Sequence, residues 1–104
     1  MFTYLLARNI DGSGVTANCL HPGVVNTKML RSAFPGMPGI PPEQGALTSV
    51  YLAVSPAVNG VSGQYFEDQK PVRLSALTYD RSVQERLWKM AEDRTGIGSD
   101  YQTT

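Results

Sequence analysis

The stretch Gly14-Val-Thr-Ala-Asn-Cys-Leu-His-Pro-Gly-Val-Val-Asn-Thr27 decides how we interpret this chain. A short apolar run over residues 15–21 begins after a glycine turn and is cut off by Pro22 and Gly23, which cannot extend a β ladder. The run therefore predicts a buried strand followed by a loop. Because helical periodicity flanks it on both sides, we expect a parallel sheet, whose ligands gather beyond the carboxyl ends of its strands. Residues 22–27 are expected at that edge.

The rest of the chain predicts further elements of an α/β fold. Apolar spacing predicts helices over residues 1–10, 42–54 and 81–95, and a short helix over residues 28–31 that Asn26 or Thr27 caps. Asp80 is the predicted N-cap of the last helix, and Gly96 is its predicted stop. Residues 64–67 predict a second strand. Two stripes are expected to be covered: Leu47, Val50, Tyr51 and Val54 in one helix, and Val83, Leu87, Met90 and Ala91 in the other.

Composition limits the kinds of function that the chain can have. Nine basic and nine acidic residues in 104 leave no net charge to attract nucleic acid or an anionic membrane. The single cysteine excludes an internal disulfide, which favours a reducing, cytoplasmic compartment. The chain has a single histidine and a single cysteine, which are too few for a closed zinc site, so no metal site is predicted. No run reaches the roughly 18 to 20 apolar residues of a membrane span. One domain is expected over residues 1–96, with a flexible tail over residues 97–104.

Three blocks carry a resemblance to a known family. They are residues 14–27, quoted above, then Pro42-Glu-Gln-Gly-Ala-Leu-Thr-Ser-Val-Tyr-Leu-Ala-Val-Ser-Pro56, and then Val61-Ser-Gly-Gln-Tyr-Phe66. With these blocks in this order, the chain resembles the short-chain dehydrogenase/reductases, and among them the retinol-dehydrogenase-like enzymes. The resemblance implies an incomplete Rossmann-like three-layer fold, with two parallel strands and about three helices.

The resemblance also implies a cofactor site in the loop after the first strand. Pro22, Gly23, Val25 and Thr27 would hold the nicotinamide side of NAD or NADP. In this assignment Pro22 and Gly23 make the turn, Val25 offers backbone groups to the carboxamide, and the Thr27 hydroxyl bonds the carboxamide or phosphate. Helix capping alone is the alternative role for Thr27.

The proline-rich stretch over residues 32–42 corresponds in the resemblance to the loop that covers the substrate. Its prolines and glycines forbid regular structure, yet it carries the apolar side chains of Phe34, Met37 and Ile40. Exposed apolar side chains of this kind are expected to cover something. A lid over a pocket is one interpretation, and a plain surface connection is the other.

The family's catalytic Tyr-x-x-x-Lys pair and its glycine-rich phosphate loop have no counterpart in this sequence. Hydride transfer to a carbonyl needs a proton donor with a lowered pKa, commonly a tyrosine beside a lysine. None of the five tyrosines is followed by lysine at the fourth position. We therefore predict that the chain contains no catalytic residue. The chain resembles the last third of such an enzyme, and it is expected to begin just after the missing lysine.

Three other patterns suggest chemistry but have simpler explanations. Tyr4 and Arg8 share a helix face and are interpreted as an ordinary helical pair. Residues 12–17 match the dinucleotide pattern G-x-G-x-x-A, but they follow a helix and precede a strand, which is the reverse of the required order and predicts a turn. Cys19 and His21 share a strand face, and buried packing is favoured for Cys19 over a role as nucleophile.

The sequence thus predicts the C-terminal portion of an NAD(P)-dependent oxidoreductase that interconverts an alcohol and a carbonyl. The apolar loop suits a hydrophobic small-molecule substrate. The alternative is a non-catalytic binding or dimerisation module derived from the same fold. Residues 15–20 would leave an unpaired apolar strand edge in so short a chain, and such an edge favours a homo-oligomer.

Overall fold

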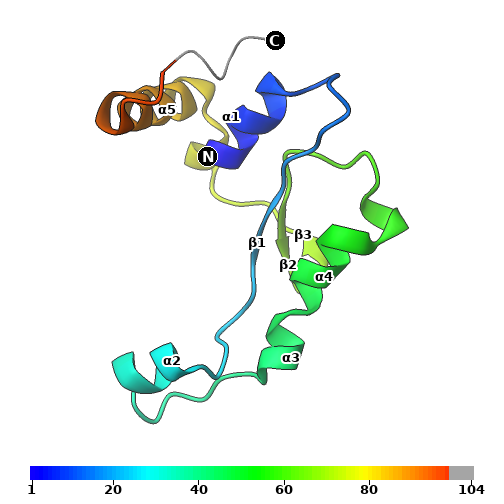
Figure 1. The fold of residues 1–104 in the computed structure, drawn as a ribbon, viewed down its shortest axis with the longest axis vertical. Helices are drawn as coiled ribbons and strands as arrows, with labels where there is room; N and C mark the ends of the chain where they lie inside the picture. Colours follow the sequence, from blue (N-terminus) through cyan, green and yellow to red (C-terminus); the bar gives the residue numbers. More distant parts are fainter. Residues whose placement is uncertain (99–104) are drawn as a thin grey trace. The chain divides into compact units, whose positions relative to one another are not determined.

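A computed structural model describes residues 1–98 of the chain (Figure 1). Its α-helices are α1 (Phe2–Asn9), α2 (Lys28–Ala33), α3 (Pro42–Gly45), α4 (Leu47–Val54) and α5 (Arg81–Thr95). Its strands are β1 (Cys19–His21), β2 (Tyr65–Glu67) and β3 (Lys70–Pro71), and its 3₁₀ helices are η1 (Pro56–Val58) and η2 (Ala76–Tyr79). The predicted tail over residues 97–104 falls mostly outside the described residues.

The chain divides into two compact units. Among the described residues, the helical unit comprises residues 1–18, 61–64 and 73–98, and it contains α1, η2 and α5. The sheet unit comprises residues 19–60 and 65–72, and it contains the three strands with α2, α3 and α4. The small α/β fold that the sequence predicts is therefore present.

The sheet unit confirms the predicted parallel pair of strands. β1 pairs with β2 in parallel, with Leu20 opposite Phe66, and the strand order is β1-β2-β3. The antiparallel strand β3 was not predicted. It forms because Asp68 and Gln69 both take positive φ, 50° and 60°, which allows a two-residue hairpin turn without the usual glycine. Pro71 is tolerated because β3 lies at the edge of the sheet.

The predicted strand over residues 15–21 is correct only for its last three residues. In the helical unit, Val15 is 62% exposed and no strand forms over residues 15–18. The Asn18 side chain instead donates to Val61 O at 2.9 Å and accepts from Gln64 N at 3.0 Å. Gly63 N donates to Ala17 O at 2.7 Å. Hydrogen bonds of the Asn18 side chain thus replace the regular backbone ladder of a strand at this position.

The covered face of α4 differs from the predicted stripe. Leu47, Val50 and Val54 are exposed, whereas Thr48 is buried. The Thr48 hydroxyl accepts a hydrogen bond from Gln69 N at 3.1 Å, and the Tyr51 ring lies against Phe66 with centroids 6.4 Å apart. The face of α4 that packs is therefore rotated by one residue, and Tyr51 is the member of the stripe that packs on the sheet. The predicted helix over residues 42–54 is also divided at Ala46 into α3 and α4.

The helical unit packs α1 against α5 and against η2 through one aromatic pair each. Phe2 stacks on Trp88 at 4.5 Å between ring centroids, and Tyr4 stacks on Tyr79 at 4.9 Å. The most buried side chain of α5 is Gln84, whereas Leu87 and Met90 of the predicted stripe are exposed. Positions 84, 88 and 91 share one face at helical spacing, and a single neighbouring helix covers only that face. Of the predicted stripe, Val83 and Ala91 are half-buried, so the prediction is wrong for Leu87 and Met90.

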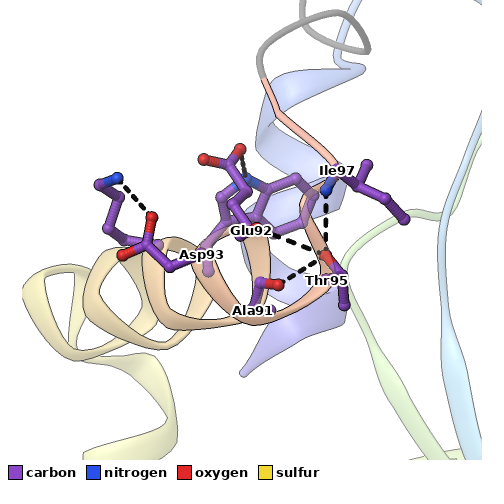
Figure 2. Close-up of polar contacts among 7 residues, drawn as sticks. Ala91, Glu92, Asp93, Thr95 and Ile97 are labelled. Carbon is purple, nitrogen blue, oxygen red and sulfur yellow. Dashed lines mark hydrogen bonds and ion pairs between the residues drawn. The ribbon is translucent and has the colours of Figure 1, made fainter.

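Both ends of α5 have the predicted caps. Asp80 accepts from Ser82 N and Val83 N, and Gly96 takes the left-handed conformation with φ of 69°. Figure 2 shows the last turn, where the Thr95 hydroxyl donates to Ala91 O at 2.7 Å and accepts from Ile97 N at 3.3 Å. No helix within residues 1–98 is both long and apolar enough to cross a membrane.

The Asp80 cap makes the stability of α5 depend on pH. The backbone N–H of Val83, followed by the bond to Ser82, holds the pKa of Asp80 below its ordinary value of 3.8. A carboxylate with a depressed folded-state pKa contributes stability that is present above its unfolded pKa and is lost as the pH falls through the folded pKa. Asp80→Asn keeps the cap without the titration. We expect acid to lower the helical circular dichroism signal less steeply in Asp80→Asn than in the wild type.

Asp11→Asn is the matched control, because Asp11 is exposed and caps no helix. It should leave the acid profile unchanged. Equal profiles for the wild type and Asp80→Asn would contradict the role of the cap.

Candidate functional site

The predicted cofactor loop directly follows the carboxyl end of β1. Gly23 takes a φ of 92°, which lets the chain turn sharply after Pro22. Val25 forms a parallel bridge with Ile40. Asn26 N donates to Ile40 O at 2.8 Å, and Ile40 N donates to Val24 O at 2.8 Å. The loop is therefore joined to the end of the proline-rich stretch by two backbone hydrogen bonds.

Val25 is held from two sides. The bridge uses Val24 O and Asn26 N on one edge of the extended segment, so the N–H and C=O of Val25 itself point to the opposite edge. The Val25 side chain packs on α3, where a Cβ added at Gly45 would lie 2.6 Å from Val25 Cγ2. The sequence pattern did not indicate the importance of Gly45. Its only signal is a glycine within a helix-forming stretch.

Thr27 is the N-cap of α2, as the sequence predicted. Its Oγ1 accepts a hydrogen bond from Leu30 N at 3.2 Å, and the residue is exposed. The alternative cap, Asn26, instead accepts from the Arg31 side chain at 3.0 Å. Because a hydroxyl both accepts and donates, the capping bond leaves the Thr27 O–H able to donate to another group.

The proline-rich stretch forms an ordered loop with its apolar side chains exposed. Met37 N donates to Phe34 O at 3.1 Å, and Gly36 has a φ of 84°, which together make a Pro-Gly β-turn. Phe34 and Met37 are exposed, and Ile40 is half-buried beside Gly23. At the base, a Cβ added to Gly39 would lie 2.7 Å from Asn26 N and 2.8 Å from Leu30 Cδ2. Only glycine therefore allows the two ends of the loop to approach.

The helical unit contains a cavity that is lined by other residues than the predicted cofactor and substrate loops. It has a volume of about 1020 Å³ and lies along α1 and α5. Its apolar lining includes Phe2, Leu6, Ile10, Trp88 and Ile97. None of the residues predicted to bind cofactor or substrate lines it.

The sequence analysis considered chemical roles for two residue pairs, Tyr4 with Arg8 and Cys19 with His21, and for the glycine turn near residue 12. Tyr4 is buried against Tyr79, and Arg8 donates to the Gln84 side chain, so each side chain contacts another element of the helical unit. Cys19 is half-buried rather than fully buried, and His21 is exposed. Residues 11–14 form a turn, with Gly12 and Gly14 at positive φ. The dinucleotide-like pattern is thus a turn, as predicted.

Tyr65 shows the opposite of the electrostatic setting that a catalytic tyrosine needs. Its hydroxyl donates to Glu67 Oε1 at 2.6 Å on β2. That hydrogen bond, followed by desolvation and the charge of Glu67, raises the pKa of Tyr65 to about 12. A general acid in a dehydrogenase works with a pKa near the operating pH. Tyr65 is therefore no substitute for the missing tyrosine–lysine pair.

Comparison with known proteins gives matches only among curated sequences. No protein-family profile and no solved structure matches the chain. Mouse retinol dehydrogenase 14 is 41% identical over 109 residues, which cover 93% of this chain and 33% of that protein. Human polyprenol dehydrogenase is 36% identical over 93% of this chain and 33% of its own length. The chain is a relative of the retinol dehydrogenases.

A bacterial protein, a probable oxidoreductase from Streptomyces lividans, is also similar, with 36% identity over 88% of this chain and 40% of its own length. The resemblance to the retinol-dehydrogenase-like branch of the short-chain dehydrogenase/reductases is thereby confirmed. The chain spans about one third of the length of the retinol and polyprenol dehydrogenases that it matches.

Proposed function

We propose that this chain is the part of an NAD(P)-dependent oxidoreductase that holds the nicotinamide side of the cofactor. The complete protein interconverts an alcohol and a carbonyl. The observation that carries the proposal is that residues 22–27 directly follow the carboxyl end of β1 in this chain, which is itself a relative of the retinol dehydrogenases. Ligands of parallel sheets gather at the carboxyl ends of the strands. Pro22, Gly23, Val25 and Thr27 form the proposed clasp.

The groups of this loop fit a nicotinamide carboxamide. A carboxamide offers one acceptor and two donors, and the outward edge of Val25 presents one N–H and one C=O. The Thr27 hydroxyl accepts from Leu30 N and has its own proton to donate. When bound, the cofactor supplies or accepts the hydride. The residues of this chain orient it, and none of them is proposed as a catalytic residue.

The proposed substrate is a hydrophobic alcohol or carbonyl compound. Two of the relatives are named for retinol and polyprenol, which are long apolar alcohols. Phe34, Met37 and Ile40 give the proposed substrate loop apolar side chains on a base fixed by backbone hydrogen bonds. The single cysteine is consistent with a proposed cytoplasmic location.

A chimera tests the clasp. The third of mouse retinol dehydrogenase 14 that matches this chain is replaced by this chain, and retinol oxidation and cofactor affinity are measured. We expect an active chimera in which Thr27→Val weakens cofactor binding by about tenfold, the value of one net hydrogen bond. Thr27→Ser should retain the affinity, because it keeps the hydroxyl. The isolated chain is expected to oxidise nothing.

The control is Thr16→Val, which alters an exposed threonine outside the clasp. A folded chimera whose cofactor affinity is unchanged by Thr27→Val contradicts the proposal. So does turnover by the isolated chain.

A second candidate function is a dimerisation module. β1 is the outermost strand of the described sheet, so one edge of its backbone is open to another strand. Sedimentation velocity of the isolated chain tests this candidate. A dimer that Leu20→Pro dissociates supports it, because proline at that position interrupts a ladder. A concentration-independent monomer contradicts it.

A further inference from the structure

The cavity of the helical unit, called here the α1–α5 cavity, is used neither by the proposed clasp nor by the proposed substrate loop. Its volume of about 1020 Å³ is near the upper end of the range of about 300–1,000 Å³ that is usual for small-molecule sites. All of its lining residues lie on α1, on α5 or on the segments that follow these two helices. Two of them, Phe2 and Ile97, are 47% and 52% exposed, so the cavity opens to solvent. A ligand can therefore enter it without any unfolding of the helices.

One wall of the cavity is aromatic. The Phe2 ring stacks on the Trp88 ring, with 4.5 Å between the centroids and 23° between the planes. Leu6 and Ile10 extend this apolar surface along the face of α1, at a spacing of four residues. Aromatic side chains bury a large apolar area when a flat or aromatic molecule lies on them. The wall therefore suits a ligand with an apolar body.

The charged side chains of the lining are all of one sign. They are Asp11, after α1, and Glu92, on α5, and among the described residues no lysine, arginine or histidine lines the cavity. Trp88 Nε1 donates to Glu92 Oε1 at 2.8 Å, which holds this carboxylate beside the aromatic wall (Figure 2). A carboxylate has about four acceptor sites, so one bond from an indole does not exhaust its capacity. The cavity thus combines an apolar wall with negative charge, which a basic group would complement.

We propose that the α1–α5 cavity binds a small organic cation, namely an amine with an apolar or aromatic body. The body lies on Phe2, Leu6 and Trp88, and the ammonium group lies beside the carboxylates of Asp11 and Glu92. A neutral apolar molecule would cover the carboxylates without giving them a partner, which costs free energy. A bare inorganic cation would leave the aromatic wall uncovered. Binding of the amine goes beyond the proposed function, because no residue of the clasp or of the substrate loop lines the cavity.

The chain carries its own reporter of binding, because Trp88 is its only tryptophan and lines the cavity. Diphenylbutylamine, diphenylbutanol and diphenylbutanoate are three probes with the same apolar body and different charges. In fluorescence titrations of the full chain, the amine should bind about tenfold more tightly than the alcohol, from two partly exposed charge interactions, and the carboxylate should bind most weakly. Salt should weaken the binding of the amine but not of the alcohol, since it screens exposed charges. Equal affinities for the amine and the alcohol overturn the proposal.

Substitution of the two carboxylates tests their part in binding. Asp11→Asn with Glu92→Gln should weaken the binding of the amine by about tenfold and leave that of the alcohol unchanged. Glutamine at position 92 keeps an oxygen acceptor for Trp88 Nε1, so the wall is retained. The matched control, Glu85→Gln with Asp93→Asn, removes the same charge from exposed positions of α5 outside the lining. Equal losses in the two double variants reduce the effect to net charge and overturn the proposal.

A filling substitution tests the location of the ligand. Ala91→Phe places a ring at a lining position and should weaken the binding of the amine by at least about tenfold, because the ring and the ligand need the same space. Ala76→Phe is the control, since Ala76 is exposed on η2 and outside the lining, and it should retain binding. Circular dichroism checks that both variants keep their helices. Unchanged binding of the amine by folded Ala91→Phe overturns the proposal.

Other occupants of the cavity give different results in the same experiments. Self-association of the chain that Ala91→Phe abolishes would assign the cavity to a second copy and overturn the proposal. Binding of the amine only after deletion of residues 99–104 would assign the cavity to that segment, with the same consequence. None of these measurements uses the cofactor affinity of the chimera, so this proposal and the proposed clasp are tested separately.

Discussion

Gln84→Leu is expected to lower the free energy of unfolding by about 2–4 kcal/mol, from two orphaned partners. Gln84 is only 2% exposed, and it joins three segments of the helical unit. Its Oε1 accepts from Arg8 Nη1 of α1 at 2.5 Å, and its Nε2 donates to Thr78 O of η2 at 2.8 Å. Leucine fills a similar volume but bonds to neither partner. Arg8 is half-buried and regains some water, which places the expected loss below the sum for two fully buried groups.

Chemical denaturation measures this loss, and a double-mutant cycle assigns it. Arg8→Met removes the cation that Gln84→Leu leaves without its side-chain acceptor. The double variant should therefore be less destabilised than the sum of the two single variants, by about 1–2 kcal/mol. Gln44→Leu is the control, because Gln44 is exposed on α3, and it should change the stability little. Strict additivity of Arg8→Met and Gln84→Leu would show that the hydrogen bond does not stabilise the fold.

Features that depend on local chemistry could be predicted from the sequence. Thr27 and Asp80 cap helices because their short side chains reach backbone donors two or three residues ahead. Gly96 ends α5 because glycine takes positive φ without strain. The parallel pairing of β1 with β2 followed from the alternation of strands and helices. In each case the determining interaction lies within a few residues or within a well-known unit.

Features that depend on distant contacts could not be predicted in this way. The strand stops short of Asn18 because the amide of Asn18 bonds to residues more than 40 positions away. Gln84 is buried because Arg8 and Thr78 supply its partners, and an apolar-stripe argument assigns a polar residue to the solvent face. Gly39 and Gly45 look like ordinary loop and helix residues until the neighbours of a missing Cβ are known. These two glycines fix the shape of the candidate site.

Gly45→Ala is expected to destabilise the sheet unit although alanine favours helices. In α3 the substitution gains about 1 kcal/mol of helix propensity. The new methyl group, however, would lie 2.6 Å from Val25 Cγ2 and 3.1 Å from Cγ1, in a buried position. Overpacking of this kind costs about 1–3 kcal/mol. Valine is stiff at χ1, so the strain passes to its backbone, and a net loss of stability is expected in thermal unfolding.

The rescue experiment separates this contact from a general effect of glycine replacement. Val25→Ala removes both methyl groups that meet the new Cβ, so Gly45→Ala should become neutral or stabilising in that background. Gly98→Ala is the control, because a Cβ there meets nothing within 4 Å.

The same pair of substitutions also tests the clasp. If the backbone of Val25 orients the nicotinamide, Gly45→Ala weakens cofactor binding in the chimera and Val25→Ala restores it. If cofactor affinity instead stays constant while stability falls, Val25 is a packing residue and not part of the clasp.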